Sequence, residues 1–239
     1  MHPKAVLDHC TELVRGLLRF QHPADAVLSQ YLRSTKPRLG PRERDTLAEC
    51  GYAVLRYKAR FEWFARSGYG DQARRLAILG MAHALPDEPD ARDFLYAALG
   101  QAEGEWLLRV LDAPESELMD GHRHNLPAWL AKQLSTELGG DAHMLALADS
   151  MLQKAPLDLR VNVLMDKRAS VCESKEFSAI KFENTPLSPI GIRVQGRPNL
   201  QYSDAFNEGR VEVQDEGSQL LVLLTDARSE ERRVGKECW

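Results

Sequence analysis

Two polar side chains with the chemistry of a nucleic-acid contact lie two positions apart, at Arg160 and Asn162. In residues 157–163, apolar side chains at odd positions alternate with polar side chains at even positions. This period of two is typical of a half-buried strand, so Arg160 and Asn162 share the face opposite Leu159 and Val161. A guanidinium and an amide on one exposed face suit contacts with phosphates and 2′-hydroxyl groups of RNA.

Lys167 and Arg168 follow this predicted strand and would extend the basic patch. The alternative is a solvent-exposed strand face without a ligand, because polar faces also occur where nothing binds.

A second candidate contact is the loop that carries Arg38, Arg42 and Arg44. Phosphate groups would be its electrostatic partners. Glu43 and Asp45 dilute its charge, and solvation of a helix end is the alternative interpretation.

Charge is distributed unevenly along the chain, whose net charge is −4. Residues 33–75 contain 11 Lys or Arg against five Asp or Glu, whereas residues 86–120 contain two against ten. This separation permits a basic face on an acidic protein, although ordinary solvated helix faces would give the same pattern.

Neither the cysteines nor the histidines form a recognisable metal-binding motif, so we expect no metal. The four cysteines are scattered without a CxxC pair, which favours buried thiols: Cys10, Cys50, Cys172 and Cys238. His122 and His124 have no third ligand at a suitable spacing and are interpreted as surface residues.

Aromatic side chains lie among the basic residues of the segment 33–75: Tyr52, Tyr57, Phe61, Trp63 and Phe64. Stacking with bases is one interpretation. Helical spacing favours core packing for Phe61 and Phe64.

The elements that carry these residues fall into two parts. Apolar stripes at helical spacing predict helices over 4–20, from about 24 to 32, from 41 to about 66, and then at the following ranges: 71–84, 90–100, 103–111, 126–138 and 141–152. Gly51 is expected to permit close helix packing. No strand-like alternation precedes residue 156, so the first 150 residues are predicted to be an all-α unit.

A small α/β unit is predicted after a boundary near residues 150–156. Alternation around residues 157–163, 180–182 and 190–194 predicts strands, and residues 168–177 predict a short helix. Residues 209–224 add a strand, a polar turn and an apolar helix, in which Asp215 either shapes the entry to a further domain with Gln214 and Ser218 or caps the helix.

No apolar run reaches the roughly 20 residues that a membrane helix needs, and the first residues carry no secretory signal, so cytoplasm is expected. Residues 228–239, RSEERRVGKECW, resemble the translation of a sequencing adapter and are excluded from the fold prediction.

Four segments occur in the order seen in RNA cytosine-C5 methyltransferases: LGPRERDTLAECGYAVLR at 39–56, PLDLRVN at 156–162, SPIGIRV at 188–194 and FNEGRVEVQDEGSQL at 206–220. The segment LPAWLAKQL at 126–134 is similar to the helix before the α/β unit of that family. Over about residues 1–225 the chain resembles the Sun/RsmB branch, whose members methylate small-subunit ribosomal RNA.

The resemblance implies an α plus α/β organisation. Residues 1–125 would form a NusB-like helical RNA-binding domain, 126–153 connecting helices, and 154–213 a small α/β domain. Residues 214–227 would begin a Rossmann-like methyltransferase domain that is otherwise truncated away.

The resemblance also implies an enzyme whose cofactor is S-adenosylmethionine. In the family, one cysteine attacks C6 of cytosine and a second assists enzyme release. The glycine-rich cofactor loop and both cysteines belong to the domain expected to be missing. We therefore expect the parent protein to be a ribosomal RNA methyltransferase, and this chain to be inactive, to bind no cofactor and to have no catalytic residue.

Two other interpretations remain. A stand-alone NusB-like RNA- or protein-binding module would be non-enzymatic, but it would not need residues 154–227. A helical scaffold with an α/β appendage would leave the ordered motifs unexplained.

Overall fold

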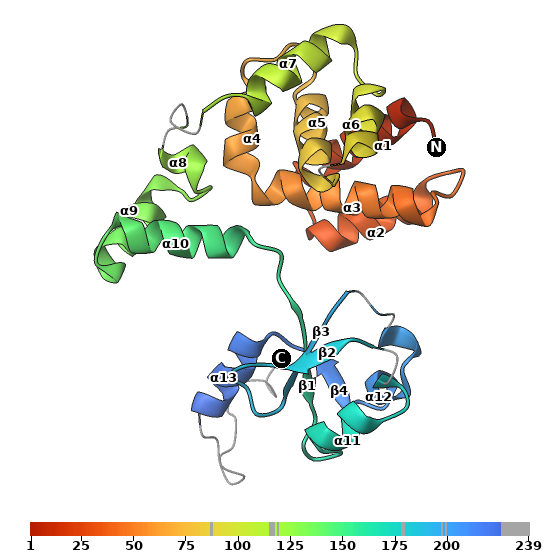
Figure 1. Cartoon of the computed structure of the whole chain (residues 1–239), viewed down its shortest axis with the longest axis vertical. Helices are drawn as coiled ribbons and strands as arrows, with labels where there is room; N and C mark the ends of the chain where they lie inside the picture. The colour runs from red at the N-terminus through yellow and green to blue at the C-terminus, as the bar shows by residue number, and fades with distance from the viewer. Residues whose placement is uncertain are drawn as a thin grey trace. The chain divides into compact units, whose positions relative to one another are not determined.

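The computed structural model describes residues 1–86, 88–114, 118, 120–177, 180–196, 198 and 200–225. The predicted adapter tail therefore lies outside the described residues. The chain divides into two compact units, 1–153 and 154–239, at the boundary predicted from the sequence (Figure 1).

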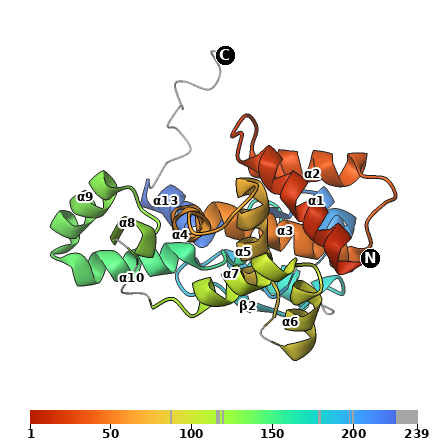
Figure 2. The same ribbon diagram turned by 90° about the horizontal axis from the view of Figure 1, so that it is seen from above.

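The N-terminal unit is entirely helical in its described part. Its helices are α1 (Pro3–Leu17), α2 (Ala24–Ser34), α3 (Pro41–Arg56), α4 (Lys58–Ala65), α5 (Gln72–Ala84), α6 (Pro89–Tyr96), α7 (Gln101–Leu111), α8 (Asp120–Arg123), α9 (Ala128–Leu138) and α10 (Asp141–Leu152). The all-α prediction is confirmed for this unit. Figure 2 shows α9 and α10 side by side as a hairpin.

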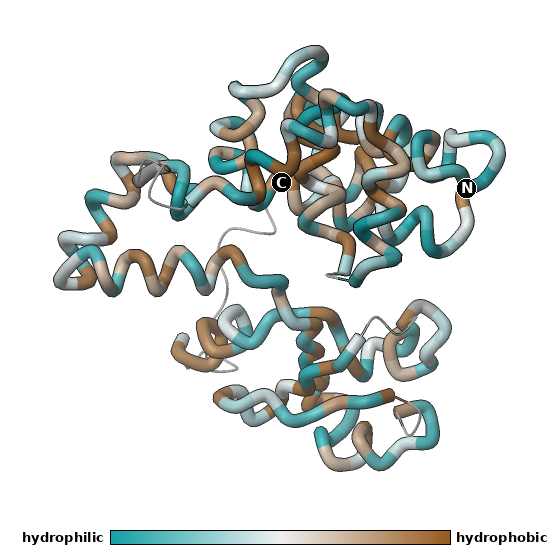
Figure 3. The backbone as a smooth tube through the Cα atoms, turned by 45° about the horizontal axis from the view of Figure 1, so that its top comes forward, coloured by the Kyte–Doolittle hydropathy of each residue, from teal (hydrophilic) through white to brown (hydrophobic). Residues whose placement is uncertain are grey.

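Helices α1, α3 and α5 form the centre of the helical core. The predicted stripe of α1 is buried, and hydrophobic segments gather in the interior of this unit (Figure 3). Two glycines allow close packing. A Cβ on Gly80 would lie 2.8 Å from the carbonyl oxygen of Cys50, and a Cβ on Gly51 would lie 2.9 Å from Leu17 Cδ1. The prediction for Gly51 is confirmed.

One predicted helix is wrong in its extent. The segment from Pro41 to about Arg66 is not continuous, because Tyr57 leaves the helical conformation with φ −104° and ψ 26°. The ring of Tyr57 lies 4.4 Å from His83 and 5.7 Å from Phe61, so it packs toward α5 at the point where α4 begins.

The C-terminal unit contains β1 (Leu157–Val161), α11 (Arg168–Glu173), β2 (Phe182–Asn184), β3 (Gly191–Val194), the 3₁₀ helix η3 (Leu200–Tyr202), α12 (Asp204–Asn207), β4 (Val211–Val213) and α13 (Glu216–Leu224). The strands form an antiparallel sheet in the order β2-β3-β1-β4. This β-α-β-β-α-β order is the ferredoxin-like arrangement, and it confirms the predicted small α/β unit.

One face of the sheet forms the core of this unit. Leu159 and Val161 of β1 are buried with Ile192 and Val194 of β3, and Phe177 packs against them. The other face carries the even-numbered residues of β1 and is covered in part by α13. Residues 221–224 of α13 are exposed although all four are apolar.

Among the described residues, no helix is long and apolar enough to cross a membrane.

Candidate nucleic-acid interface

The strand that carries Arg160 has the predicted alternation. Leu159 and Val161 are buried, while the Arg160 side chain stays 32% exposed on the opposite face. Arg160 lies beside Glu212 of β4 in the sheet register, and the two side chains form an ion pair. The guanidinium is therefore placed on the predicted face, but part of its charge is neutralised.

Asn162 forms the turn at the end of β1. Its Nδ2 donates to the carbonyl oxygen of Gly209 at 3.2 Å, and its Oδ1 accepts from the N–H of Leu164 at 3.2 Å. The amide thus joins the end of β1 to the residues before β4, and its contact with RNA stays a prediction.

Lys167 and Arg168 have different surroundings at the start of α11. Lys167 is exposed at the N-terminal cap position. Arg168 is half-buried, and its Nη1 donates to the carbonyl oxygens of Ser188 at 3.2 Å and Gly191 at 3.4 Å. Lys167 is free to contact a ligand, whereas Arg168 connects α11 to the segment before β3.

Arg38, Arg42 and Arg44 are all exposed, near and within the first turn of α3. Within the described part of the chain, none of them forms an ion pair. Glu43, which was expected to dilute their charge, accepts from the amino group of Met1 at 2.9 Å. That hydrogen bond holds the pKa of Glu43 below its usual value. All three guanidinium groups are thus exposed within one short segment, residues 38–44, and we call Arg38, Arg42 and Arg44 the exposed basic cluster.

Asp215 caps helix α13. Its carboxylate accepts from the N–H of Ser218 at 2.9 Å and from the Ser218 hydroxyl at 2.6 Å. These hydrogen bonds lower the pKa of Asp215. The capping interpretation is confirmed, and Ser218 is its partner.

Glu216 and Gln219 attach α13 to the sheet, a role that sequence reasoning missed. Glu216 Oε1 accepts from the N–H groups of Leu187 at 2.5 Å and Ser188 at 2.7 Å. Gln219 is 1% exposed; its Oε1 accepts from the Ser188 hydroxyl at 2.7 Å, and its Nε2 donates to the carbonyl oxygen of Gln214 at 2.8 Å. The presence of the polar residues Glu216 and Gln219 in an otherwise apolar helix was the sequence signal that could have indicated this role.

A buried carboxylate lies beneath this junction. Asp158 of β1 is 3% exposed and accepts from Arg193 Nε at 2.8 Å and Nη2 at 2.9 Å. It also accepts from the N–H of Glu216 at 3.3 Å, while Arg193 Nη2 lies 3.6 Å from Glu216 Oε2. A continuous polar network therefore joins β1, β3 and α13; we call these residues, Asp158, Ser188, Arg193, Glu216 and Gln219, the junction network.

The junction network predicts acid sensitivity of the C-terminal unit. Burial alone would raise the pKa of Glu216, but the N–H groups of Ser188 and Leu187 and the charge of Arg193 together lower it. A lowered folded-state pKa contributes stability that is present above the unfolded-state pKa and is lost as pH falls through the folded-state value.

Stability of this unit is therefore expected to be constant above about pH 5, near the upper end of carboxylate titration, and to fall below it. Urea unfolding measured between pH 3 and pH 7 checks this, with Glu216→Gln as the comparison. The Gln variant should have a smaller free energy of unfolding at pH 7 and should lose less of it as the pH falls. An equal dependence of unfolding free energy on pH in both proteins would contradict the role assigned to Glu216.

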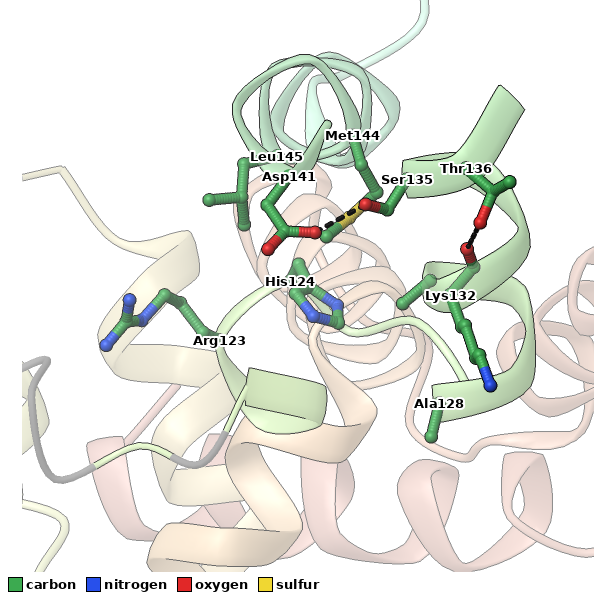
Figure 4. Close-up of a pocket in the computed structure, with 10 residues that line it drawn as sticks. Arg123, His124, Ala128, Lys132, Ser135, Thr136, Asp141, Met144 and Leu145 are labelled. Atoms are coloured by element: carbon green, nitrogen blue, oxygen red, sulfur yellow. Dashed lines mark hydrogen bonds between the residues drawn. The ribbon is translucent and has the colours of Figure 1, made fainter. Parts of the chain in front are cut away.

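A hollow of about 580 Å³ lies between α8, α9 and α10. Figure 4 shows Arg123 and Lys132 on opposite sides of it, with His124 between them. The carboxylate of Asp141 accepts from the Ser135 hydroxyl at 2.5 Å.

His124 corrects one sequence interpretation. It is 4% exposed rather than a surface residue, and its Nδ1 accepts from the N–H of Leu126 at 3.4 Å. His122 is half-buried, with its ring 4.7 Å from that of Trp63. The described residues contain no group of three His, Cys, Asp or Glu side chains arranged for a metal.

Comparison with known proteins identifies one domain. Residues 126–201 match the family model described as "Methyltr_RsmF/B-like, ferredoxin-like domain". This agrees with the strand order, and the match also includes α9 and α10, which were expected to be connecting helices before the small α/β domain.

A curated relative extends the similarity along the chain. The chain is 26% identical over 238 residues to the probable ribosomal RNA small subunit methyltransferase B of Synechocystis sp.. The alignment covers 96% of this chain and 50% of that protein, so the chain spans about half the length of the relative. The resemblance to the Sun/RsmB family is confirmed by these two matches.

A solved structure shares the fold. The crystal structure of PH0851 superposes with a TM-score of 0.61 at 18% sequence identity, covering 95% of this chain and 56% of that one. The succession of a helical part and a small α/β part is therefore a known arrangement.

Proposed function

We propose that this chain is the RNA-recognition part of an S-adenosylmethionine-dependent ribosomal RNA methyltransferase that acts on C5 of cytosine. The observation that carries the proposal is the similarity to a small-subunit ribosomal RNA methyltransferase over 96% of the chain. The ferredoxin-like unit supports it. Residues 214–219 belong to the segment FNEGRVEVQDEGSQL, which carries part of the resemblance, and they join α13 to the sheet of this unit. The proposed location is the cytoplasm.

Two basic surfaces are the proposed RNA contacts. The first is the sheet face and α11 start with Arg160, Asn162, Lys167 and Arg168. The second is the exposed cluster Arg38, Arg42 and Arg44, in a helical unit that we propose to be NusB-like. Guanidinium and ammonium groups bind phosphates and release counterions, so such contacts make affinity depend on salt.

The described cysteines do not fit the thiolate chemistry of cytosine methylation. Cys10 and Cys50 are fully buried in the helical core. A hydrogen bond with Cys10, together with burial, raises the pKa of Cys50, and burial raises that of Cys172. A raised pKa disfavours the nucleophilic thiolate, so we assign no step of methyl transfer to residues of this chain. Bound S-adenosylmethionine would supply the methyl group in the parent enzyme.

A stand-alone NusB-like module is the second candidate. It accounts for the helical unit alone. The ferredoxin-like unit and the family match at residues 126–201 favour the methyltransferase interpretation.

The sheet face can be tested through its ion pair. Fluorescence anisotropy with a labelled fragment of small-subunit ribosomal RNA should show binding by the chain. Glu212→Gln releases Arg160 and should strengthen binding about twofold, since exposed ion pairs contribute below about 1 kcal/mol. Arg160→Ala should weaken binding and reduce the salt slope by about 0.7 to 0.9.

The matched control is Glu208→Gln, which removes the same charge from an exposed carboxylate that pairs with Arg210. Equal effects of the two Gln variants, with no effect of Arg160→Ala, would remove the sheet face from the interface. Absence of RNA binding by the unmodified chain at low salt would overturn the proposed function. A calorimetric titration should show no S-adenosylmethionine binding; micromolar affinity would contradict the expected lack of a cofactor site.

A further inference from the structure

A second hollowed surface lies on the helical unit, and none of the residues proposed above as RNA contacts lines it. Two adjoining hollows of about 500 Å³ and 320 Å³ share Phe64, Val110 and Ala113. They follow α4 and α7, and we call them together the Trp63 groove. Its charged and aromatic lining residues are Tyr57, Arg60, Phe61, Trp63, Phe64, Arg66, His83 and Arg109.

Planar side chains already lie against the aromatic rings Trp63 and Phe64 of this groove. The guanidinium of Arg66 lies 5.1 Å from the Trp63 ring centroid, and the His122 ring lies 4.7 Å from Trp63 at an interplanar angle of 36°. The guanidinium of Arg60 lies 5.9 Å from the centroid of Phe64. Stacked aromatic and guanidinium planes are the groups on which unpaired bases stack in single-strand-binding proteins.

The charge of the groove matches a phosphate backbone. Among its described lining residues, three are arginines and none is Asp or Glu. Arg66 and Arg109 are exposed and form no ion pair within the described part of the chain. The carboxylate on α4, Glu62, is held by Lys58 at 2.7 Å and does not line the groove.

His83 at one end contributes hydrogen bonding rather than charge. Burial lowers the pKa of His83, and the nearby Arg56 and Arg60 lower it further. The imidazole is therefore neutral at neutral pH and can both donate and accept.

We infer that the Trp63 groove binds single-stranded RNA, with bases stacked at Trp63 and Phe64 and phosphates at Arg66 and Arg109. The inference rests on the proposed function, because it assigns a further contact to the same class of ligand. Helix α4 has eight residues and is about 12 Å long, which limits the contact to about two nucleotides. A duplex hides its base faces, so an unpaired segment is required.

Two variants of the whole chain test this. The probe is a 5′-fluorescein-labelled single-stranded RNA of mixed sequence, about 12 nucleotides long and so several times the two-nucleotide contact, with its annealed duplex as comparison. Trp63→Leu should weaken single-strand binding about tenfold, the loss expected for one stacked base, with little change in salt slope. The double variant Arg66→Gln, Arg109→Gln should instead reduce the salt slope by about 1.4.

The double variant Lys4→Gln, Arg19→Gln is the control, because both residues are exposed on or just beyond α1. Far-UV circular dichroism verifies folding, and Trp63→Phe should restore binding in part. Ultraviolet crosslinking of 4-thiouridine RNA should label residues 58–66.

RNA binding by the unmodified chain, with groove variants equal to the control and crosslinks elsewhere, would overturn the groove and leave the proposed function intact. No binding by the unmodified chain would overturn both. Displacement of the RNA by an equal concentration of oligoglutamate would show an acidic-peptide site and would also overturn the inference.

Discussion

Replacing Asp158 with alanine is expected to lower the free energy of unfolding of the C-terminal unit by about 2 to 4 kcal/mol. The substitution removes the acceptor of both Arg193 hydrogen bonds and of the N–H of Glu216. Arg193 would then be left against a single carboxylate at 3.6 Å. Breaking one side of a buried pair is costly because the remaining charge stays partly desolvated. Arg193 is 28% exposed, which places the expected loss below that of a fully buried pair.

Hydrogen exchange measured by mass spectrometry at increasing urea, on peptides covering β1 and β3, separates this unit from the helical one. Glu212→Ala is the matched control on the same sheet, since its carboxylate is 52% exposed and its pair with Arg160 should contribute less than about 1 kcal/mol. In the double variant Asp158→Ala, Arg193→Ala, the loss of unfolding free energy should be smaller than the sum of the losses in the two single variants. An Asp158→Ala loss no greater than that of Glu212→Ala would show that the junction network does not hold the unit together.

Replacing Arg38, Arg42 and Arg44 together with glutamine is expected to weaken binding of the ribosomal RNA fragment about tenfold to a hundredfold at 0.1 M salt. Each phosphate contact on a single strand contributes about 0.7 to the salt slope, so the slope should fall by about 2. Folding should be unaffected, because all three side chains are exposed. The amino group of Met1 holds Glu43 at 2.9 Å, which leaves the three guanidinium charges less opposed.

Anisotropy titrations between 50 and 300 mM salt measure both quantities, a range over which such electrostatic contacts weaken strongly. The variant Lys4→Gln, Arg19→Gln again serves as the control for lost positive charge. If the salt slope changed by the same amount per removed positive charge in the triple variant and in the control, the effect would be long-range attraction. Arg38, Arg42 and Arg44 would then not contact the RNA.

The period-two pattern around Arg160 predicted the strand and the placement of Arg160 opposite Leu159 and Val161, but the strand ends at Val161, and Val163 is exposed. Each side chain in a strand points opposite to its neighbours, so this information is local. The cap at Asp215 was also predictable, because an acidic residue before an apolar helix bonds to amides only three positions away.

The junction network was not predictable from the same pattern. Asp158 meets Arg193 at a distance of 35 residues and Glu216 at 58 residues along the chain, so the pairing depends on strand order. The break at Tyr57 was missed for the same reason. Its ring packs against His83 of a different helix, and helical periodicity on either side gives no sign of it. His124 appeared exposed because its loop is polar, whereas α9 and α10 cover it.

The short outer strands of the sheet determine how this unit can recognise another molecule. Both β2 and β4 have three residues, and β4 carries Glu212 outward. Edges this short and charged offer too few free amide and carbonyl groups to accept an additional strand. Main-chain augmentation by a peptide is thereby disfavoured, and so is edge-to-edge self-association. The C-terminal unit must then select the molecule it binds through its side chains. Single substitutions can therefore change which molecule it binds.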